Sequence, residues 1–147
     1  VEKAIKNEYD DWQDEAKSSL ALIIILDQFS RNLFRNNPKS YSQDMKARLL
    51  VTEGIDRQYL DELETLEKFF YLLPLIHSED LQDHIYLHQL GEVFLKDNPN
   101  YENIKKSWND HTVVIKKFGR YPHRNEILNR ESTSEEVEFL KEPNSSW

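Results

Sequence analysis

LALIIILDQFSRN, at residues 20–32, is the stretch of sequence that decides the fold. Its first seven residues are all apolar, and a helix that is apolar on every side belongs in the centre of a protein core. The run is too short to span a bilayer, which needs about 20 residues. Phe29, Leu33 and Phe34 continue one apolar stripe while the other positions turn polar. We therefore predict a central helix whose C-terminal end brings polar groups close to the core.

Amphipathic helices are predicted on both sides of this segment, because apolar residues recur every three or four positions. Capping boxes at 40–43 and 133–136 and a capping serine at Ser78 mark three helix starts. Pro74 is expected to kink or end its helix, because proline cannot donate a backbone hydrogen bond. The expected helices lie at residues 1–16, 18–36, 40–53, 66–74, 78–96, 101–118 and 133–140. They predict an all-α single domain over residues 1–147, an antiparallel helical bundle or short tetratricopeptide-like solenoid of about seven helices.

Composition excludes several classes of protein. The chain has no cysteine, which removes disulfides, thiolate nucleophiles and cysteine-based zinc sites. Because this fits a reducing compartment, we expect a cytoplasmic protein. The formal net charge of −8 argues against nucleic acid or a membrane as a partner. The sequence does not indicate an oligomeric state.

Charge is distributed unevenly, and the most unusual stretch is the turn FGRYPHRN at 118–125. Residues 111–130 hold five Lys or Arg and one acid, a local charge of +4. Arg120 and Arg124 can bind carboxylate or phosphate through paired hydrogen bonds, and His123 can titrate near neutral pH. We predict an anion-binding turn, and a solvated basic connection is the alternative.

Two further polar motifs offer partners for such a site. Asp27 and Arg31 lie four residues apart, hence on one helix face. They form either a salt bridge between helices or a pair that faces a ligand. In HSED at 77–80, His77 can act as acid or base beside a helix start, with Glu79 near the positive helix end. The alternative there is a packed histidine and a helix cap.

The other histidines also allow two interpretations. His111 lies on the apolar stripe of the helix at 101–118, where it is either a core histidine or a side chain that lines the same cavity. Asp80, His84 and His88 follow one another at intervals of four and could approach one metal ion, but the HExxH pattern is absent. Glycine-rich phosphate loops, GxSxG and nucleotide fingerprints are missing as well. We therefore predict no metal site and no cofactor.

Taken in this order, the motifs resemble a bacterial family known as domain of unknown function 924. The matching stretches are LDQFSRN at 26–32 with Arg35 and Asp44, LPLIHSEDL at 73–81, His111, FGRYPHRN at 118–125, ILNREST at 127–133 and the ending FL…SSW. The resemblance covers nearly the whole chain and implies an all-α, tetratricopeptide-like fold, but it supplies no activity. The family's N-terminal Phe-Trp-Phe segment is absent, so we expect this chain to lack that segment or to have diverged in it.

Together these observations predict a polar pocket that binds a small anionic ligand. The expected ligand-binding residues are Asp27, Arg31, Glu79, His111, Arg120 and Arg124. If the pocket is hydrolytic, the expected acid or base is His77 or His123. The residues leave open whether the protein is an enzyme. One alternative is a tetratricopeptide-like module that binds a protein or peptide in a groove without catalysis, and another is that the polar motifs only clamp helices together.

Overall fold

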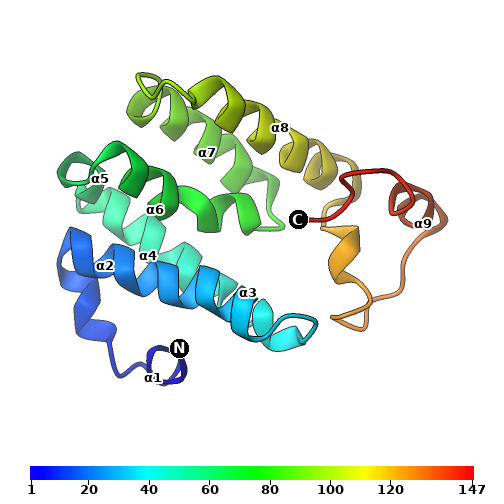
Figure 1. Ribbon diagram of the computed structural model, residues 1–147, viewed down its shortest axis with the longest axis horizontal. Coiled ribbons are helices and arrows are strands. Elements are labelled where there is room, and N and C mark those ends of the chain that lie inside the picture. The colour runs from blue at the N-terminus through cyan, green and yellow to red at the C-terminus, as the bar shows by residue number, and fades with distance from the viewer.

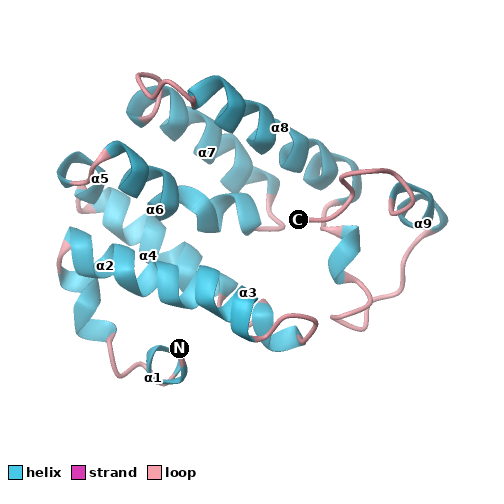
Figure 2. Cartoon of the chain, viewed as in Figure 1, coloured by secondary structure: helices cyan, strands magenta, loops and turns pink.

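A computed structural model describes all residues from 1 to 147 and contains helices and loops but no strands (Figures 1 and 2). The prediction of an all-α fold is confirmed. The α-helices are α1 (Glu2–Ile5), α2 (Ala16–Ile24), α3 (Ser30–Leu33), α4 (Asp44–Asp56), α5 (Tyr59–Glu62), α6 (Thr65–His77), α7 (Leu81–Phe94), α8 (Tyr101–Phe118) and α9 (Ser134–Phe139). Short 3₁₀ helices lie at Asp10–Asp14, Pro38–Ser40 and Pro122–Arg124, and a π-helical turn lies at Ile25–Phe29. No helix is both long enough and apolar enough to cross a membrane.

The central helix forms as predicted, but its winding is not uniform. α2 and α3 are continuous through the π-helical turn 25–29, which contains Asp27. Its hydrogen bonds join residues five apart instead of four, and such turns occur frequently at functional sites. Leu22 and Leu26 are fully buried, and Asp27 next to them is only 1% exposed. The helix thus carries a carboxyl group into the edge of the core.

The longer helices pack as neighbours around one main apolar cluster. α2 packs against α4 and α6, α6 packs against α4, α7 and α8, and α7 packs against α8 (Figure 1). Packing is closest at Gly54 of α4, where an added Cβ atom would lie 1.8 Å from the hydroxyl oxygen of Tyr71 in α6. That hydroxyl group is also 2.9 Å from Ser19 Oγ in α2. Glycine at position 54 therefore allows these three helices to meet.

Several predictions about helix boundaries are wrong. The expected helix at 1–16 divides into α1 and a 3₁₀ turn, because Asn7 between them adopts a left-handed φ of 65°. The segment around Ser40 forms a 3₁₀ helix instead of the first turn of α4, which begins after it. Ser78 does not cap α7, because the Asp80 side chain accepts the hydrogen bond from the first turn.

Two other helix ends bear directly on the site. α6 continues through Pro74 as far as His77, so proline does not end it. His77 therefore lies at the C-terminal end of a helix, which carries a partial negative charge. Thr133 and Glu136 form the predicted capping box of α9, in which each side chain accepts a hydrogen bond from the backbone N–H of the other residue.

The chain after α8 folds against one end of the bundle (orange to red in Figure 1) and is largely loop (Figure 2). Gly119 ends α8 with a φ of 69°, a left-handed conformation that glycine adopts without steric cost. Val114, Ile115 and Tyr121 then form a second, smaller buried cluster, against which Phe139 packs. The C-terminal part of the chain is thus attached to the bundle through a small core of its own.

Candidate functional site

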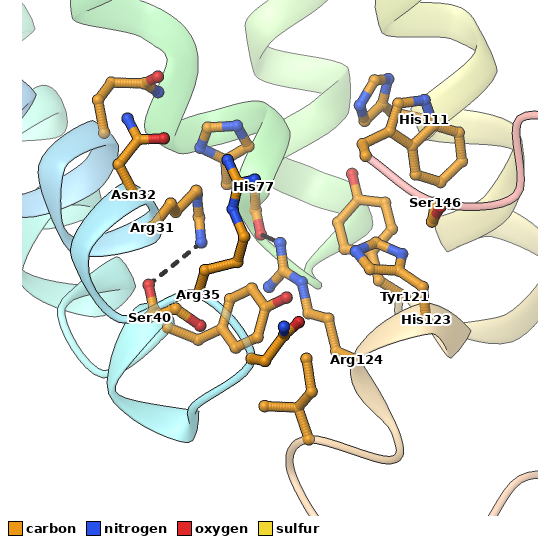
Figure 3. Close-up of a pocket in the computed structure, with 15 residues that line it drawn as sticks. Arg31, Asn32, Arg35, Ser40, His77, His111, Tyr121, His123, Arg124 and Ser146 are labelled. Carbon is orange, nitrogen blue, oxygen red and sulfur yellow. Dashed lines mark hydrogen bonds between the residues drawn. The ribbon is translucent and has the colours of Figure 1, made fainter.

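A cavity of about 620 Å³ lies where the C-terminal part of the chain meets the end of the bundle (Figure 3). Its lining residues are Gln28, Arg31, Asn32, Arg35, Asn36, Ser40, Tyr41, His77, His111, Tyr121, His123, Arg124, Ile127, Ser146 and Trp147. Three of these are arginines and three are histidines, while none is Asp or Glu. The side chains of the cavity therefore offer many hydrogen-bond donors and no acidic group.

A buried carboxylate orients His77 from behind the cavity. His77 Nδ1 lies 2.7 Å from Asp27 Oδ1, and Arg31 donates a hydrogen bond of 3.3 Å to the same oxygen. Burial raises the pKa of Asp27, but His77, Arg31 and Gln28 together outweigh it and leave the pKa below its ordinary value of 3.8. Because an ionised carboxylate only accepts hydrogen bonds, Nδ1 of His77 must be the donor. Nε2 is then the ring nitrogen that remains for a ligand in the cavity.

Asp44 joins two arginines from distant parts of the chain. Arg31 lies 3.0 Å from Asp44 Oδ1, and Arg124 donates a hydrogen bond of 3.3 Å to Asp44 Oδ2. Burial raises the pKa of Asp44 more than the two arginines lower it. The guanidinium group of Arg124 lies between the rings of Tyr41 and Tyr121, 4.6 Å from each ring centre. Stacking of this kind fixes the guanidinium plane at the cavity wall.

Several polar groups of the cavity residues have no partner within the protein. Arg35 is exposed, lines the cavity and forms no ion pair, and Figure 3 shows its side chain beside Arg31. The Nε atoms of Arg31 and Arg124 and Nδ1 of His123 are buried without a hydrogen bond. Buried polar groups are almost always hydrogen-bonded, so these three atoms are exceptions within the protein.

Aromatic rings form the opposite side of the cavity. Trp147 lies over His111 with ring centres 4.3 Å apart, and its ring centre is 5.8 Å from those of Tyr121 and His123. Burial lowers the pKa of His111 to about 4, and burial together with Arg124 lowers the pKa of His123 to about 4. Both imidazoles are therefore neutral at pH 7, so these two side chains bring no positive charge to this side of the cavity.

Three residues that the sequence predicts as ligand-binding do not line the cavity: Asp27, which lies behind His77, and Glu79 and Arg120. Glu79 accepts hydrogen bonds from Arg130, at 2.6 and 2.9 Å, and from the Tyr121 backbone N–H at 2.8 Å. Arg120 donates to both carboxylate oxygens of Glu136, at 2.7 and 2.8 Å. These pairs fasten the turn at 118–125 to α9 and to the loop before α7. The structure thus supports the clamp interpretation for Glu79 and Arg120, because buried or partly buried charges are matched at both.

The clamp at Glu136 predicts a pH-dependent contribution to stability. Hydrogen bonds from Arg120 lower the pKa of Glu136 from 4.5 to about 2. Because the pKa is depressed in the folded state, the stabilisation is complete above pH 4.5 and disappears as pH falls toward 2. Glu136→Gln is expected to lower Tm at pH 7 by roughly 5 °C, and the difference from wild type should shrink below pH 4. Thermal unfolding at pH 3 to 7 measures this, with exposed Glu135→Gln as control, and an unchanged difference across that range would contradict it.

The remaining predicted residues do come together. Arg31, His77, His111, His123 and Arg124 line the cavity, and Asp27 lies behind His77. Sequence reasoning did not assign a role to four further lining residues, Arg35, Tyr41, Tyr121 and Trp147. Arg35 and Trp147 belong to stretches that resemble the family, whereas Tyr41 carried no signal in the sequence.

The histidines of α7 have structural partners. His84 is fully buried, with Nε2 2.9 Å from the Ser78 carbonyl oxygen and Nδ1 3.0 Å from Thr112 Oγ1. His88 Nε2 lies 3.0 Å from the same hydroxyl oxygen. The structure contains no group of three or more His, Cys, Asp or Glu side chains that could hold a metal ion. These two histidines therefore tie α7 to α8.

Comparison with known proteins gives a family and a fold. The family model described as "Bacterial protein of unknown function (DUF924)" matches residues 1–144. The match starts at residue 1, so it gives no support to the expectation that an N-terminal segment of the family is missing. No curated protein matches the chain. Among solved structures, the chain is similar to protein of unknown function ATU0120 from Agrobacterium tumefaciens, with 35% identity and a TM-score of 0.84 over 96% of this chain and 77% of that one. The chain belongs to the bacterial family of domain of unknown function 924.

Proposed function

We propose that this protein binds a small anionic ligand, a carboxylate or a phosphate, in the cavity at the end of the bundle. The observation that carries the proposal is the imbalance of charge there. Three guanidinium groups line the cavity, no Asp or Glu side chain does, and Arg35 has no ion-pair partner. Asp27 and Asp44 pair with Arg31 and Arg124 from behind, so one positive charge is left over. An anion would neutralise it through the paired hydrogen bonds that guanidinium groups form with carboxylate and phosphate.

The size of the cavity also favours a small molecule. A volume of about 620 Å³ is in the range of pockets that enclose metabolite-sized ligands. A peptide-binding module would instead need a long open groove, with the polar motifs satisfied by one another. Here the chain's own residues 146 and 147 form part of the cavity wall, and the lining residues Arg31, His123 and Arg124 each have a buried nitrogen without a partner in the protein. These features favour the anionic ligand over the peptide.

Changing Arg35 to alanine tests this proposal with little risk to the fold. Because Arg35 is exposed and unpaired, Tm should not change. A hydrogen bond to a charged group contributes about 1.5–3 kcal/mol, so Kd for phenyl phosphate or benzoate should rise about tenfold to 100-fold. Isothermal titration calorimetry measures Kd, and Lys116→Ala serves as the charge-matched control because Lys116 is exposed and lines no cavity. Wild-type affinity in Arg35→Ala would remove the site from this cavity.

A second candidate function is hydrolysis of a phosphate ester, favoured specifically by the Asp27–His77 pair. A buried carboxylate that holds Nδ1–H leaves Nε2 free to accept a proton, as a general base requires. Water would attack phosphorus while the bond from phosphorus to the alcohol oxygen breaks. The proton released by water passes to His77 Nε2, and the leaving oxygen takes up one proton, so one water is consumed. The arginines would hold the negative charge of the phosphoryl oxygens.

Release of p-nitrophenolate from p-nitrophenyl phosphate is the direct assay for this second function. Turnover by the purified wild-type chain that is lost in His77→Gln supports hydrolysis. Binding of phenyl phosphate without any turnover would leave anion binding as the function and exclude this reaction for phosphate monoesters. His123→Gln distinguishes the two histidines predicted as acid or base. It should keep turnover, because only His77 has a ring nitrogen that is hydrogen-bonded to a carboxylate.

A further inference from the structure

The cavity has two chemically different sides, and together they specify the shape of a ligand (Figure 3). We call Arg31, Arg35 and Arg124 the arginine side and His111, Tyr121, His123 and Trp147 the aromatic side. The arginine side comes from the central helix, the loop after it and the turn at 118–125. The aromatic side comes from α8, the same turn and the C-terminal residues. These sides meet at Arg124, which stacks on Tyr121.

The aromatic side presents ring surface more than hydrogen-bonding groups. The hydroxyl of Tyr121 donates a hydrogen bond to the backbone oxygen of Ile76, away from the cavity. His111 Nδ1 lies 2.7 Å from the Ser107 carbonyl oxygen, which can only accept, so Nδ1 is the donor. Trp147 is 46% exposed although it contacts three other rings, so part of its surface stays open. The Tyr121 hydroxyl and His111 Nδ1 are thus engaged within the protein, while ring surface remains open at Trp147.

Such a surface binds planar rings better than it binds alkyl groups or water. Aromatic rings prefer offset-stacked or edge-to-face contacts at centroid distances of about 4.5–7 Å, and the rings here already form edge-to-face pairs, His111 with Tyr121 and Tyr121 with Trp147. No side chain on this side carries a positive charge, because both imidazoles are neutral at pH 7. A second anionic group on the ligand would therefore find no partner there.

We infer that the ligand is an aromatic anion, with its carboxylate or phosphate on the arginine side and its ring on the aromatic side. This inference rests on the proposed function and adds the class of ligand to it. Ile127 and Tyr41 also line the cavity. A simple alkyl phosphate or acetate would use the arginine side alone.

Matched pairs of ligands test the inference, namely phenyl phosphate against methyl phosphate and benzoate against acetate. The aromatic member of each pair should bind at least about tenfold more tightly to the wild-type chain by isothermal titration calorimetry. Trp147→Ala should reduce this ratio to less than about threefold and leave the affinity for methyl phosphate unchanged, whereas Trp147→Phe should keep the ratio. Arg35→Ala should weaken both members of a pair by the same factor.

The outcomes separate this inference from the proposed function. Equal affinity for aromatic and alkyl members overturns the inference and leaves anion binding intact. A tenfold ratio that persists in Trp147→Ala also overturns it, because the ring would then bind elsewhere. Failure of all four ligands to bind overturns both the proposed function and the inference. Trp147 is substantially exposed, so its variants should keep the wild-type Tm, which thermal unfolding checks in the same samples.

Discussion

Asp27→Asn is expected to lower kcat for p-nitrophenyl phosphate about 100-fold to 10,000-fold, provided that the wild-type chain turns this ester over. Asparagine has nearly the same shape, but its amide nitrogen is a hydrogen-bond donor. When it donates to His77 Nδ1, it stabilises the tautomer whose proton is on Nε2. His77 Nε2 would then carry the proton and could not accept one from water. Asp27 contacts no bound ligand in this scheme, because it lies behind His77 and is 1% exposed. It acts as a positioning residue.

Comparing single and double variants distinguishes this role from a structural one. If Asp27 acts only through His77, the double variant Asp27→Asn/His77→Gln should be no slower than His77→Gln alone. A structural role would instead make the two losses multiply. The affinity for phenyl phosphate should change little in Asp27→Asn, because the arginine side remains. A rate close to wild type in Asp27→Asn would exclude the pair as the source of catalysis.

Arg124→Ala is expected to lower the free energy of unfolding by about 3 kcal/mol, which corresponds to a fall in Tm of roughly 6–12 °C for a chain of this size. Arg124 is 6% exposed, donates to the His77 carbonyl oxygen at 3.0 Å and pairs with Asp44. Its removal leaves a buried carboxylate with one partner fewer and opens space between two tyrosine rings. Urea or thermal unfolding followed by tryptophan fluorescence measures the change.

Ligand binding by the same variant tests whether Arg124 has two roles. Because Arg124 also lines the cavity, the folded fraction of Arg124→Ala should bind phenyl phosphate at least about tenfold more weakly at a temperature well below its Tm. Arg124→Lys keeps the charge but loses the planar stack, so its free energy of unfolding should lie between those of the wild type and Arg124→Ala. Arg35→Ala is the control for loss of an unpaired arginine. A variant with wild-type stability but no binding would show that the helices do not need Arg124 as a clamp.

The local sequence was sufficient to predict a side-chain contact where both residues lie within one or two helical turns of each other. The apolar run 20–26 identified the core helix, and the spacing of Asp27 and Arg31 placed both on one face, where they pair at 3.3 Å. The capping box of α9 was predicted for the same reason. The helix expected at 1–16 failed, because helical spacing does not reveal that Asn7 takes a left-handed conformation. Such a backbone choice depends on what the segment packs against.

Ion pairs between residues far apart in the chain could not be predicted from the local sequence. Glu79 and Arg120 both looked suited to an anion, but Arg130 neutralises the first across 51 positions and Glu136 neutralises the second across 16. The local charge of +4 in residues 111–130 is therefore largely compensated from outside that segment. Arg35, by contrast, became a candidate ligand-binding residue only in the structure, because it lines the cavity and forms no ion pair.

The sequence by itself determined an all-α fold, a central helix that carries Asp27 and Arg31 at the edge of the core, and a cluster of cationic and polar residues in the turn at 118–125. Those features follow from periodicity and from the chemistry of residues close together in the chain. The tertiary structure decided which charges remain for a ligand. Asp44 and Arg124 are 80 positions apart, and Trp147 reaches His111 only because the chain folds back over the end of the bundle. Electrostatic pairing and ring stacking act over a few ångströms in space, so only the folded chain shows that Arg35 stays unpaired while Glu79 and Arg120 do not.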